Sequence, residues 1–194
     1  MAAQFASLPE FKFYDAAHKD EHSLEVQLPF LQKVLKTFQI VPMVYGDVRP
    51  EVLAAAIEPV LKRPDTLLVV SADLSHYHDY ETARVLDAQT AELVAGKEAE
   101  LEDHMSCGAT GINASLIIAK ENALRPEMLE LINSGDTAGD KEHVVGYGAW
   151  SFGASDPDGN KKLLPKLEQE TLNLQLFAKA YKRELLQVAA NALN

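Results

Sequence analysis

Short apolar runs along the chain predict the strands of a sheet. Residues 66–72 (TLLVVSA) form the clearest run, because it is continuous, short and rich in β-branched residues, as buried strands are. Residues 40–46 (IVPMVYG) and 144–153 (VVGYGAWSFG) also predict strands, and residues 11–14 (FKFY) predict a short one. Residues 127–135 (EMLELINSG) fit either a strand or the end of a helix.

Apolar residues spaced three and four apart predict helices between these strands. This spacing occurs at 23–38, 49–63, 80–96 and 112–122. Strands that alternate with helices between residues 40 and 153 predict an α/β fold with a largely parallel sheet. In such a sheet, ligands bind at the carboxyl ends of the strands.

The composition of the chain changes after residue 153. The segment ASDPDGNKK is rich in turn-forming residues and predicts a linker over 154–163. The residues after it repeat the helical spacing of apolar side chains. We therefore expect an α/β domain at 1–153, the linker, and a carboxyl-terminal amphipathic helix at 164–194.

The 194 residues have the composition of a globular protein, with 47% hydrophobic and 24% charged residues. The net charge of −11 gives an acidic surface that repels phosphate backbones and anionic lipids, so we expect no nucleic-acid and no membrane binding. No apolar run approaches the roughly 20 residues of a membrane-spanning helix, and the start lacks the pattern of a signal peptide. The single cysteine, Cys107, cannot form an internal disulfide, and these features together predict a cytoplasmic protein.

The first candidate for chemistry is SADLSHYHDY (71–80), which follows the clearest strand and should lie at its carboxyl end. Asp73 precedes His76 by three residues, and an aspartate can hold an imidazole in one tautomer and stabilise its charged form, as general acid/base catalysis requires. His78 and Asp79 are possible metal ligands. The simpler interpretation is a polar loop in which Asp79 caps the next helix.

The second candidate is DEHSLEVQLPFLQ (20–32), where Glu21, His22 and Glu25 stand at the start of a predicted helix. Residues 22 and 25 share a helix face, as do residues 21 and 25. Acidic residues at a helix amino end also favour the helix dipole, which accounts for the acids but not for His22. Pro29 removes a hydrogen bond to the Glu25 carbonyl and predicts a kink that leaves this carbonyl free for water or a ligand.

The third candidate is SCGATGIN (106–113), where Cys107 precedes two glycines and a predicted helix. A thiol near a helix amino end tends toward the thiolate, which binds metals or attacks electrophiles. The alternative is that Cys107 is a small buried hydrophobic residue, as lone cysteines often are.

Four ordered segments, EHSLEVQLPFLQ, VVSADLSHY, SCGATGI and NSGDTAGDKEHVVGYGAW, resemble the Memo-like family, whose bacterial and archaeal members are also called AmmeMemoRadiSam system protein B. The resemblance covers residues 20–153. The family is similar in fold to the catalytic subunits of class III extradiol dioxygenases, which use non-haem iron. The resemblance therefore implies an α/β/α sandwich.

The resemblance also implies roles for the candidate residues. Glu21, His22 and Glu25 would line the cleft and contact the substrate. His76 would be the acid/base residue with Asp73 behind it, and Cys107 would be a metal ligand.

The chain departs from the family pattern in one respect. Family members carry a further amino-terminal part with a Pro-His-Ala-Gly-like and a Pro-Ser-His-like motif, and the ligand histidines of both motifs are absent here. Cys107 alone cannot hold iron or copper tightly, because stable sites use three or four protein ligands. A fragment or a misplaced start is the first explanation. A natural truncation, or a reduced site made by His22, His76 and Cys107, are the others.

Two functions from different classes follow from the resemblance. The first is a metal-dependent oxidoreductase using iron or copper, or the remnant of one. The second is a non-catalytic adaptor that binds a peptide or a small acid in the same cleft. A metal-independent hydrolase using Ser71 or Ser75 with His76 is disfavoured, because no Gly-x-Ser-x-Gly pattern occurs. A truncated sheet would expose edge strands, so we also expect a homo-oligomer or association through that sheet.

Overall fold

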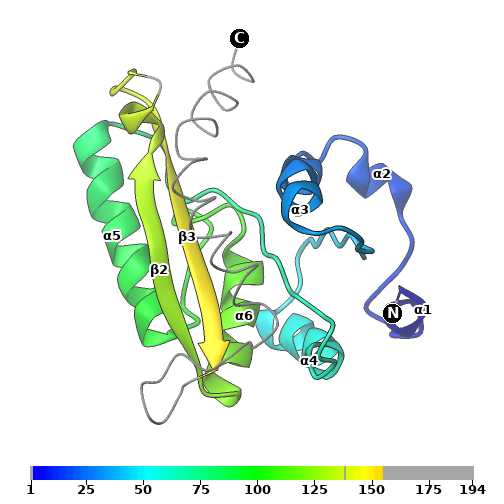
Figure 1. Ribbon diagram of the computed structural model, residues 1–194. Helices are drawn as coiled ribbons and strands as arrows, with labels where there is room; N and C mark the ends of the chain where they lie inside the picture. Colours follow the sequence, from blue (N-terminus) through cyan, green and yellow to red (C-terminus); the bar gives the residue numbers. More distant parts are fainter. Residues whose placement is uncertain (1, 138, 155–194) are drawn as a thin grey trace.

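A long β-hairpin at the end of the described chain forms most of the sheet in the computed structural model, which describes residues 2–137 and 139–154 (Figure 1). Its strands are β2 (Leu124–Asn133) and β3 (Val144–Ala154), which pair antiparallel from Leu124 opposite Ala154 to Asn133 opposite Gly146. The short strand β1 (His76–His78) pairs antiparallel with the start of β3, so the three-stranded order is β1-β3-β2.

Six α-helices and two short 3-10 turns complete the described elements. The helices are α1 (Ala2–Ala6), α2 (Asp15–His18), α3 (Leu28–Val34), α4 (Pro50–Leu61), α5 (Tyr80–Gly96) and α6 (Ala109–Glu121). The 3-10 turns are η1 (Glu25–Gln27) and η2 (Ser134–Asp136). None of the helices in this part of the chain combines the length and the hydrophobicity needed to cross a membrane.

The mixed α/β class is confirmed, but the strand pairs differ from the expected parallel sheet. All strand pairs within the described residues are antiparallel. The expected strands at 11–14, 40–46 and 66–72 do not form there, because none of these segments has a neighbouring strand among residues 2–137 and 139–154 to complete its hydrogen-bond ladder. β3 ends at Ala154, and the rest of the predicted linker (154–163) and carboxyl-terminal helix (164–194) lies outside the described residues.

Helix α6 lies at the centre of the packing, between α4 and the hairpin (Figure 1). One hydrophobic cluster joins α4 to α6 through residues that include Ile57 and Ile118, and Phe5 of α1 reaches into it. A second cluster joins α5 and α6 to the hairpin, with Leu116 fully buried near Trp150. Burial in these two clusters supplies the main stabilisation of the fold.

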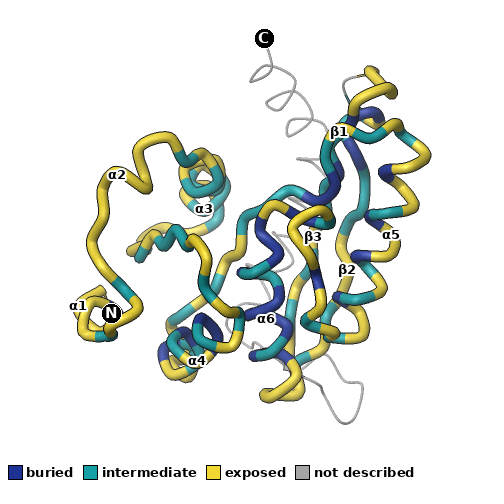
Figure 2. The backbone as a smooth tube through the Cα atoms, turned by 180° about the vertical axis from the view of Figure 1, so that it is seen from behind, coloured by how far each residue is buried: buried dark blue, intermediate teal, exposed yellow. Residues whose placement is uncertain are grey.

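Residues 2–34 lie apart from the hairpin, as the two opposite views agree (Figures 1 and 2). Most of this segment is exposed (Figure 2). Besides Phe5, a side-chain hydrogen bond links it to the body of the protein, from Gln27 Nε2 to Ser71 Oγ at 2.8 Å.

The predicted kink at Pro29 takes another form. The expected helix 23–38 is divided into η1 and α3, and Pro29 occupies the first turn of α3, where its missing amide hydrogen costs little. The Glu25 carbonyl is not free, because it accepts a hydrogen bond from the Leu28 amide. The prediction of an open carbonyl at Glu25 is therefore wrong.

Helix α5 forms as its pattern predicts, and its start explains the role of Asp79. The Asp79 side chain accepts hydrogen bonds from the amides of Glu81 and Thr82 at 3.1 and 3.0 Å. Asp79 is therefore the helix cap of the simpler interpretation. At the other end, Lys97 adopts a left-handed conformation (φ 55) that terminates the helix after Gly96.

The loop before β1 is held by buried Asp87 of α5. The Asp87 carboxylate, 2% exposed, accepts the Ser75 amide at 3.0 Å. It also fills the space that a Cβ on Gly146 would need, so the strand opposite must carry glycine there. The Ser75 carbonyl in turn accepts the Gly146 amide at 2.8 Å, and the Leu74 amide donates to the Gly146 carbonyl at 2.9 Å.

We predict that the Asp87 side chain stabilises the fold through its hydrogen bond to the Ser75 amide and destabilises it through its buried negative charge. Burial raises the pKa of Asp87, partly offset by the Ser75 amide. The folded state therefore holds this proton more tightly than the unfolded state, and its contribution to stability falls as pH rises from the unfolded pKa through the raised one. Asp87→Asn keeps an acceptor and should flatten this fall.

Asp87→Ala leaves the buried Ser75 amide without its acceptor and should lower the free energy of unfolding by about 1–3 kcal/mol at every pH. Urea unfolding of the wild type and both variants over an acid-to-neutral pH series measures both effects. Parallel pH profiles for the wild type and Asp87→Asn would refute the role assigned to the charge.

Candidate functional site

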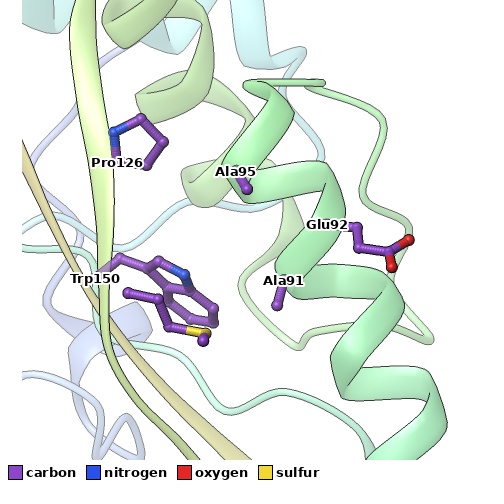
Figure 3. Close-up of a pocket in the computed structure, with 6 residues that line it drawn as sticks. Ala91, Glu92, Ala95, Pro126 and Trp150 are labelled. Carbon is purple, nitrogen blue, oxygen red and sulfur yellow. The ribbon is translucent and has the colours of Figure 1, made fainter.

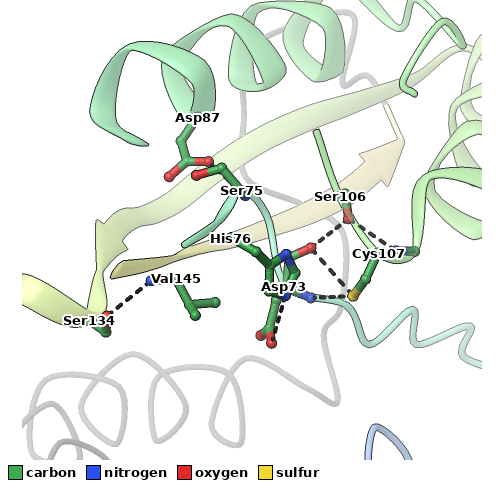
Figure 4. A network of polar contacts seen from close by, with 9 residues as sticks. Asp73, Ser75, His76, Asp87, Ser106, Cys107, Ser134 and Val145 are labelled. Carbon is green, nitrogen blue, oxygen red and sulfur yellow. Dashed lines mark hydrogen bonds and ion pairs between the residues drawn. The ribbon is translucent and has the colours of Figure 1, made fainter. Parts of the chain in front are cut away.

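Asp73 lies between His76 and Cys107 and contacts both (Figure 4). The Asp73 Oδ2 is 3.7 Å from His76 Nε2. The Asp73 amide donates to the Cys107 Sγ at 3.3 Å, and its carbonyl accepts the Ser106 hydroxyl at 2.6 Å. Two segments more than 30 residues apart in sequence are thus joined at one aspartate.

The start of α6 determines where the thiol lies. Gly108 is the amino-terminal cap of α6, and its amide donates to the Ser106 Oγ at 3.2 Å. A Cβ on Gly108 would collide with Ala72, so glycine allows the two segments to approach closely. Cys107 is exposed, and the alternative of a buried hydrophobic cysteine is wrong.

The environment of Asp73 makes its carboxyl group easier to protonate than usual. Burial raises the pKa of Asp73, while the charge of the nearby His76 lowers it in part. Half of the Asp73 side chain and about a third of the His76 side chain (31%) remain exposed, so both groups are accessible from solvent.

Two tyrosines that the sequence patterns do not single out border this arrangement. Burial raises the pKa of Tyr45, and the neighbouring Cys107 and Glu21 raise it further. Burial also raises the pKa of Tyr147, with a contribution from the charge of Asp73. Tyr45 also donates to the Gly108 carbonyl at 3.2 Å. Tyr45 could have been predicted as a site residue from its position, because it stands at the carboxyl end of the predicted strand 40–46.

The expected cleft residues of the amino-terminal segment are only partly gathered here. Glu21 lies close enough to Tyr45 to affect its pKa, and the Glu21 carboxylate accepts the Ser23 amide at 2.6 Å, which lowers the pKa of Glu21. His22 and Glu25 pair with each other, Nδ1 to Oε1 at 2.6 Å, with side chains 81% and 53% exposed. This pair raises the pKa of His22 and lowers that of Glu25. The hydrogen bonds and ion pairs of the described residues do not connect either side chain to Asp73, His76 or Cys107.

The strand β1 carries an unusual conformation beside His76. Tyr77 has a left-handed φ of 61, which a non-glycine residue adopts only at a cost, and its ring is exposed. The strain coincides with a register shift in the pairing of β1 with β3 between His76 and His78. Sequence patterns give no sign of it, because Tyr is ordinary in strands.

The donor set does not amount to a metal site on its own. Among residues 2–137 and 139–154, no three or more His, Cys, Asp or Glu side chains are grouped so that they could hold a metal ion. Asp73, His76 and Cys107 therefore do not fit iron or copper as a complete ligand set. His22 lies with Glu25 rather than with these residues, so the reduced site of His22, His76 and Cys107 is not formed.

A hydrophobic cavity of about 230 Å³ lies elsewhere, between α5 and the hairpin (Figure 3). Its lining includes Ala91 and Ala95 of α5 and Pro126, Met128 and Trp150 of the strands. The Glu92 carboxylate points away from the Trp150 ring (Figure 3). None of the candidate residues lines this cavity, and its lining is almost entirely apolar.

Comparison with known proteins agrees with the motifs. The sequence profile described as Memo-like protein matches residues 2–151. A MEMO1 family protein of Metallosphaera sedula is 37% identical over 155 residues, which cover 71% of this chain and 54% of that protein. A MEMO1 family protein of Thermotoga petrophila is 37% identical over 142 residues, covering 68% of this chain and 50% of that protein. The chain thus spans about half the length of these relatives, and with three quarters of its residues inside the profile it belongs to the Memo-like protein family.

Proposed function

We propose that Asp73, His76 and Cys107 form the working site of this chain, and that it carries out proton transfer beside a thiol. His76 takes up and returns a proton, Asp73 stabilises the charged imidazole, and Cys107 supplies a nucleophilic or metal-binding sulfur. The observation that supports this proposal is the position of Asp73, whose carboxylate faces His76 while its amide donates to the Cys107 sulfur.

The distance between Asp73 and His76 is consistent with a catalytic pair that has no substrate bound. The distance of 3.7 Å between Asp73 Oδ2 and His76 Nε2 is longer than a hydrogen bond. Catalytic hydrogen bonds are often long without substrate and shorten when it binds. The raised pKa of Asp73 keeps part of the aspartate protonated at higher pH than usual.

The family resemblance suggests a metal-dependent oxidoreductase and a sheet of parallel strands within an α/β/α sandwich. We propose both this activity and this fold for the protein, with Asp73 and His76 as its acid/base residues. Iron or copper would need further ligands, because the described residues do not supply three. We therefore assign His76 and Asp73 roles that do not depend on a metal.

The small number of metal ligands among the described residues also favours a second function. A site with fewer than three metal ligands among the described residues can still bind a carboxylate or a phosphopeptide through His76. The chain would then be a binding module for a peptide or small acid. Binding that survives a strong chelator, without turnover, distinguishes this function from the first.

We predict that His76 determines how easily Asp73 loses its proton. His76→Ala removes the nearby charge that lowers the pKa of Asp73, so this pKa should rise further above its ordinary value. NMR titration of the labelled Asp73 carboxyl carbon measures the change. His104→Ala, which removes an exposed histidine paired with Glu102, is the matched control and should leave the Asp73 titration in place. An unchanged midpoint in His76→Ala would show that the two groups do not act as a pair.

We predict that the charges at Asp73 and His76 control the reactivity of Cys107. Because Cys107 is the only cysteine of the chain, its alkylation by iodoacetamide can be followed by mass spectrometry without interference. Asp73→Asn removes a nearby negative charge and should raise the rate at neutral pH by about threefold or more, and His76→Ala should lower it. Asp79→Asn, at the cap of α5, is the control. Equal rates in all the variants would exclude Cys107 from the proposed site.

We predict that the chain alone does not retain metal. After loading with Fe(II) or Cu(II) and dialysis against a chelator, elemental analysis should find much less than one metal ion per chain, because the described residues lack three convergent ligands. Retention of one ion that both His76→Ala and Cys107→Ser abolish would overturn this prediction and restore a metal centre within the chain.

A further inference from the structure

Strand β1 contains one residue more than the stretch of β3 that it pairs with. His76 pairs with Val145 and His78 with Val144, so Tyr77 has no counterpart on β3. An extra residue of this kind is a β-bulge, and bulges beside functional sites redirect neighbouring side chains. The ring of Tyr77 has its centroid 5.7 Å from that of His76. The Tyr77 bulge thus lies directly beside the proposed acid/base residue.

The conformation of Tyr77 is imposed by its surroundings and not by its own side chain. A left-handed φ of 61 is costly for a residue with a Cβ, and it persists where the neighbouring structure holds it. The Tyr77 ring is 75% exposed, so packing of the ring offsets little of this cost. The chain after the bulge is fixed by Asp79, which caps α5. The chain before the bulge is fixed at Ser75.

Two different elements hold Ser75. Its carbonyl accepts a hydrogen bond from the Gly146 amide at 2.8 Å, as in ordinary pairing with β3. Its amide has no strand to pair with, because β1 is an edge strand of the sheet in the part of the chain that the structure describes. The Asp87 carboxylate of α5 accepts this amide instead, at 3.0 Å (Figure 4). Asp87 therefore takes the place of a neighbouring strand at this position.

The packing around Asp87 makes this support rigid. The side chain is 2% exposed, and the carboxylate lies so close to Gly146 that a Cβ on that glycine would collide with it. A buried acceptor confined in this way can meet the Ser75 amide in few other positions. The support is thus a fixed point from which the bulge begins.

We propose that Asp87 is a positioning residue for His76. By fixing the Ser75 peptide, it holds the Tyr77 bulge in the strained form that places the imidazole beside Asp73. This inference rests on the acid/base role proposed for His76. Asp73 is anchored separately, through its backbone contacts with the residues before α6. The distance of 3.7 Å between the carboxylate and the imidazole therefore depends on the support that Asp87 gives to the other side.

The ring nitrogens of His76 provide the test. Their ¹⁵N chemical shifts, measured at neutral pH in the labelled full chain, report the protonation and hydrogen bonding of the imidazole. Asp73→Asn gives the reference spectrum of a His76 that has lost its partner. We expect Asp87→Ala to move the His76 resonances most of the way to that reference. Asp87→Asn keeps an acceptor for the Ser75 amide and should retain the wild-type spectrum.

Two further variants separate positioning from stability. Thr90→Ala alters another fully buried side chain of α5, which bonds to the Leu86 carbonyl, so it should destabilise the fold but leave the His76 spectrum in place. Glycine adopts a positive φ without strain, so Tyr77→Gly combined with Asp87→Ala should restore the His76 spectrum of Tyr77→Gly alone. Asp87→Glu, which displaces the acceptor by one methylene, replaces Asp87→Ala if that variant does not fold.

Three results would overturn the inference. The first is a wild-type His76 spectrum in Asp87→Ala, and the second is no recovery in the double variant with Tyr77→Gly. The third is an Asp87→Asn spectrum equal to that of Asp87→Ala, which would assign the effect to charge and not to the hydrogen bond. A His76 spectrum that Asp73→Asn leaves unchanged would instead refute the pair of the proposed function itself, so the two failures are distinguishable.

Discussion

The backbone of Asp73 is the point on which the arrangement of the candidate site depends. Its amide and carbonyl bind the sulfur of Cys107 and the hydroxyl of Ser106, and so fasten the segment before β1 to the start of α6. Its side chain is thereby left to face His76. A single residue uses its main chain to join two parts of the fold and its carboxylate to serve the chemistry.

Buried contacts on the other side hold this segment in place. The Asp87 carboxylate accepts a hydrogen bond from the Ser75 amide, and Gly146 of β3 forms backbone hydrogen bonds with Leu74 and Ser75. Burying a carboxylate has an energetic cost, consistent with the raised pKa of Asp87, and its hydrogen bond to the buried Ser75 amide offsets part of that cost. Strand pairing with β3 thus begins near Leu74, and within the described residues the segment just before it has no strand partner.

The sequence predicts those elements that are stabilised by their own residues. Helix α5 has its apolar spacing, its Asp79 cap and its terminal glycine within one stretch, and it forms over the expected residues. The hairpin of β2 and β3 likewise finds its partner within the chain. Residues 40–46 and 66–72 have equally strong patterns, but a strand also needs a neighbour, and the pattern of one segment carries no information about whether that neighbour is present.

The same distinction explains which site residues could be predicted. Asp73, His76 and Cys107 come together as motif order suggests, because each stands beside an element that forms. His22 and Glu25 stand on a segment largely apart from the body of the fold, and they satisfy each other instead. Residues 67–70 lead directly into Asp73, and among the described residues their amides and carbonyls make no backbone hydrogen bond. Asp73 is therefore held by its contacts with Ser106 and Cys107 and not by the segment that precedes it.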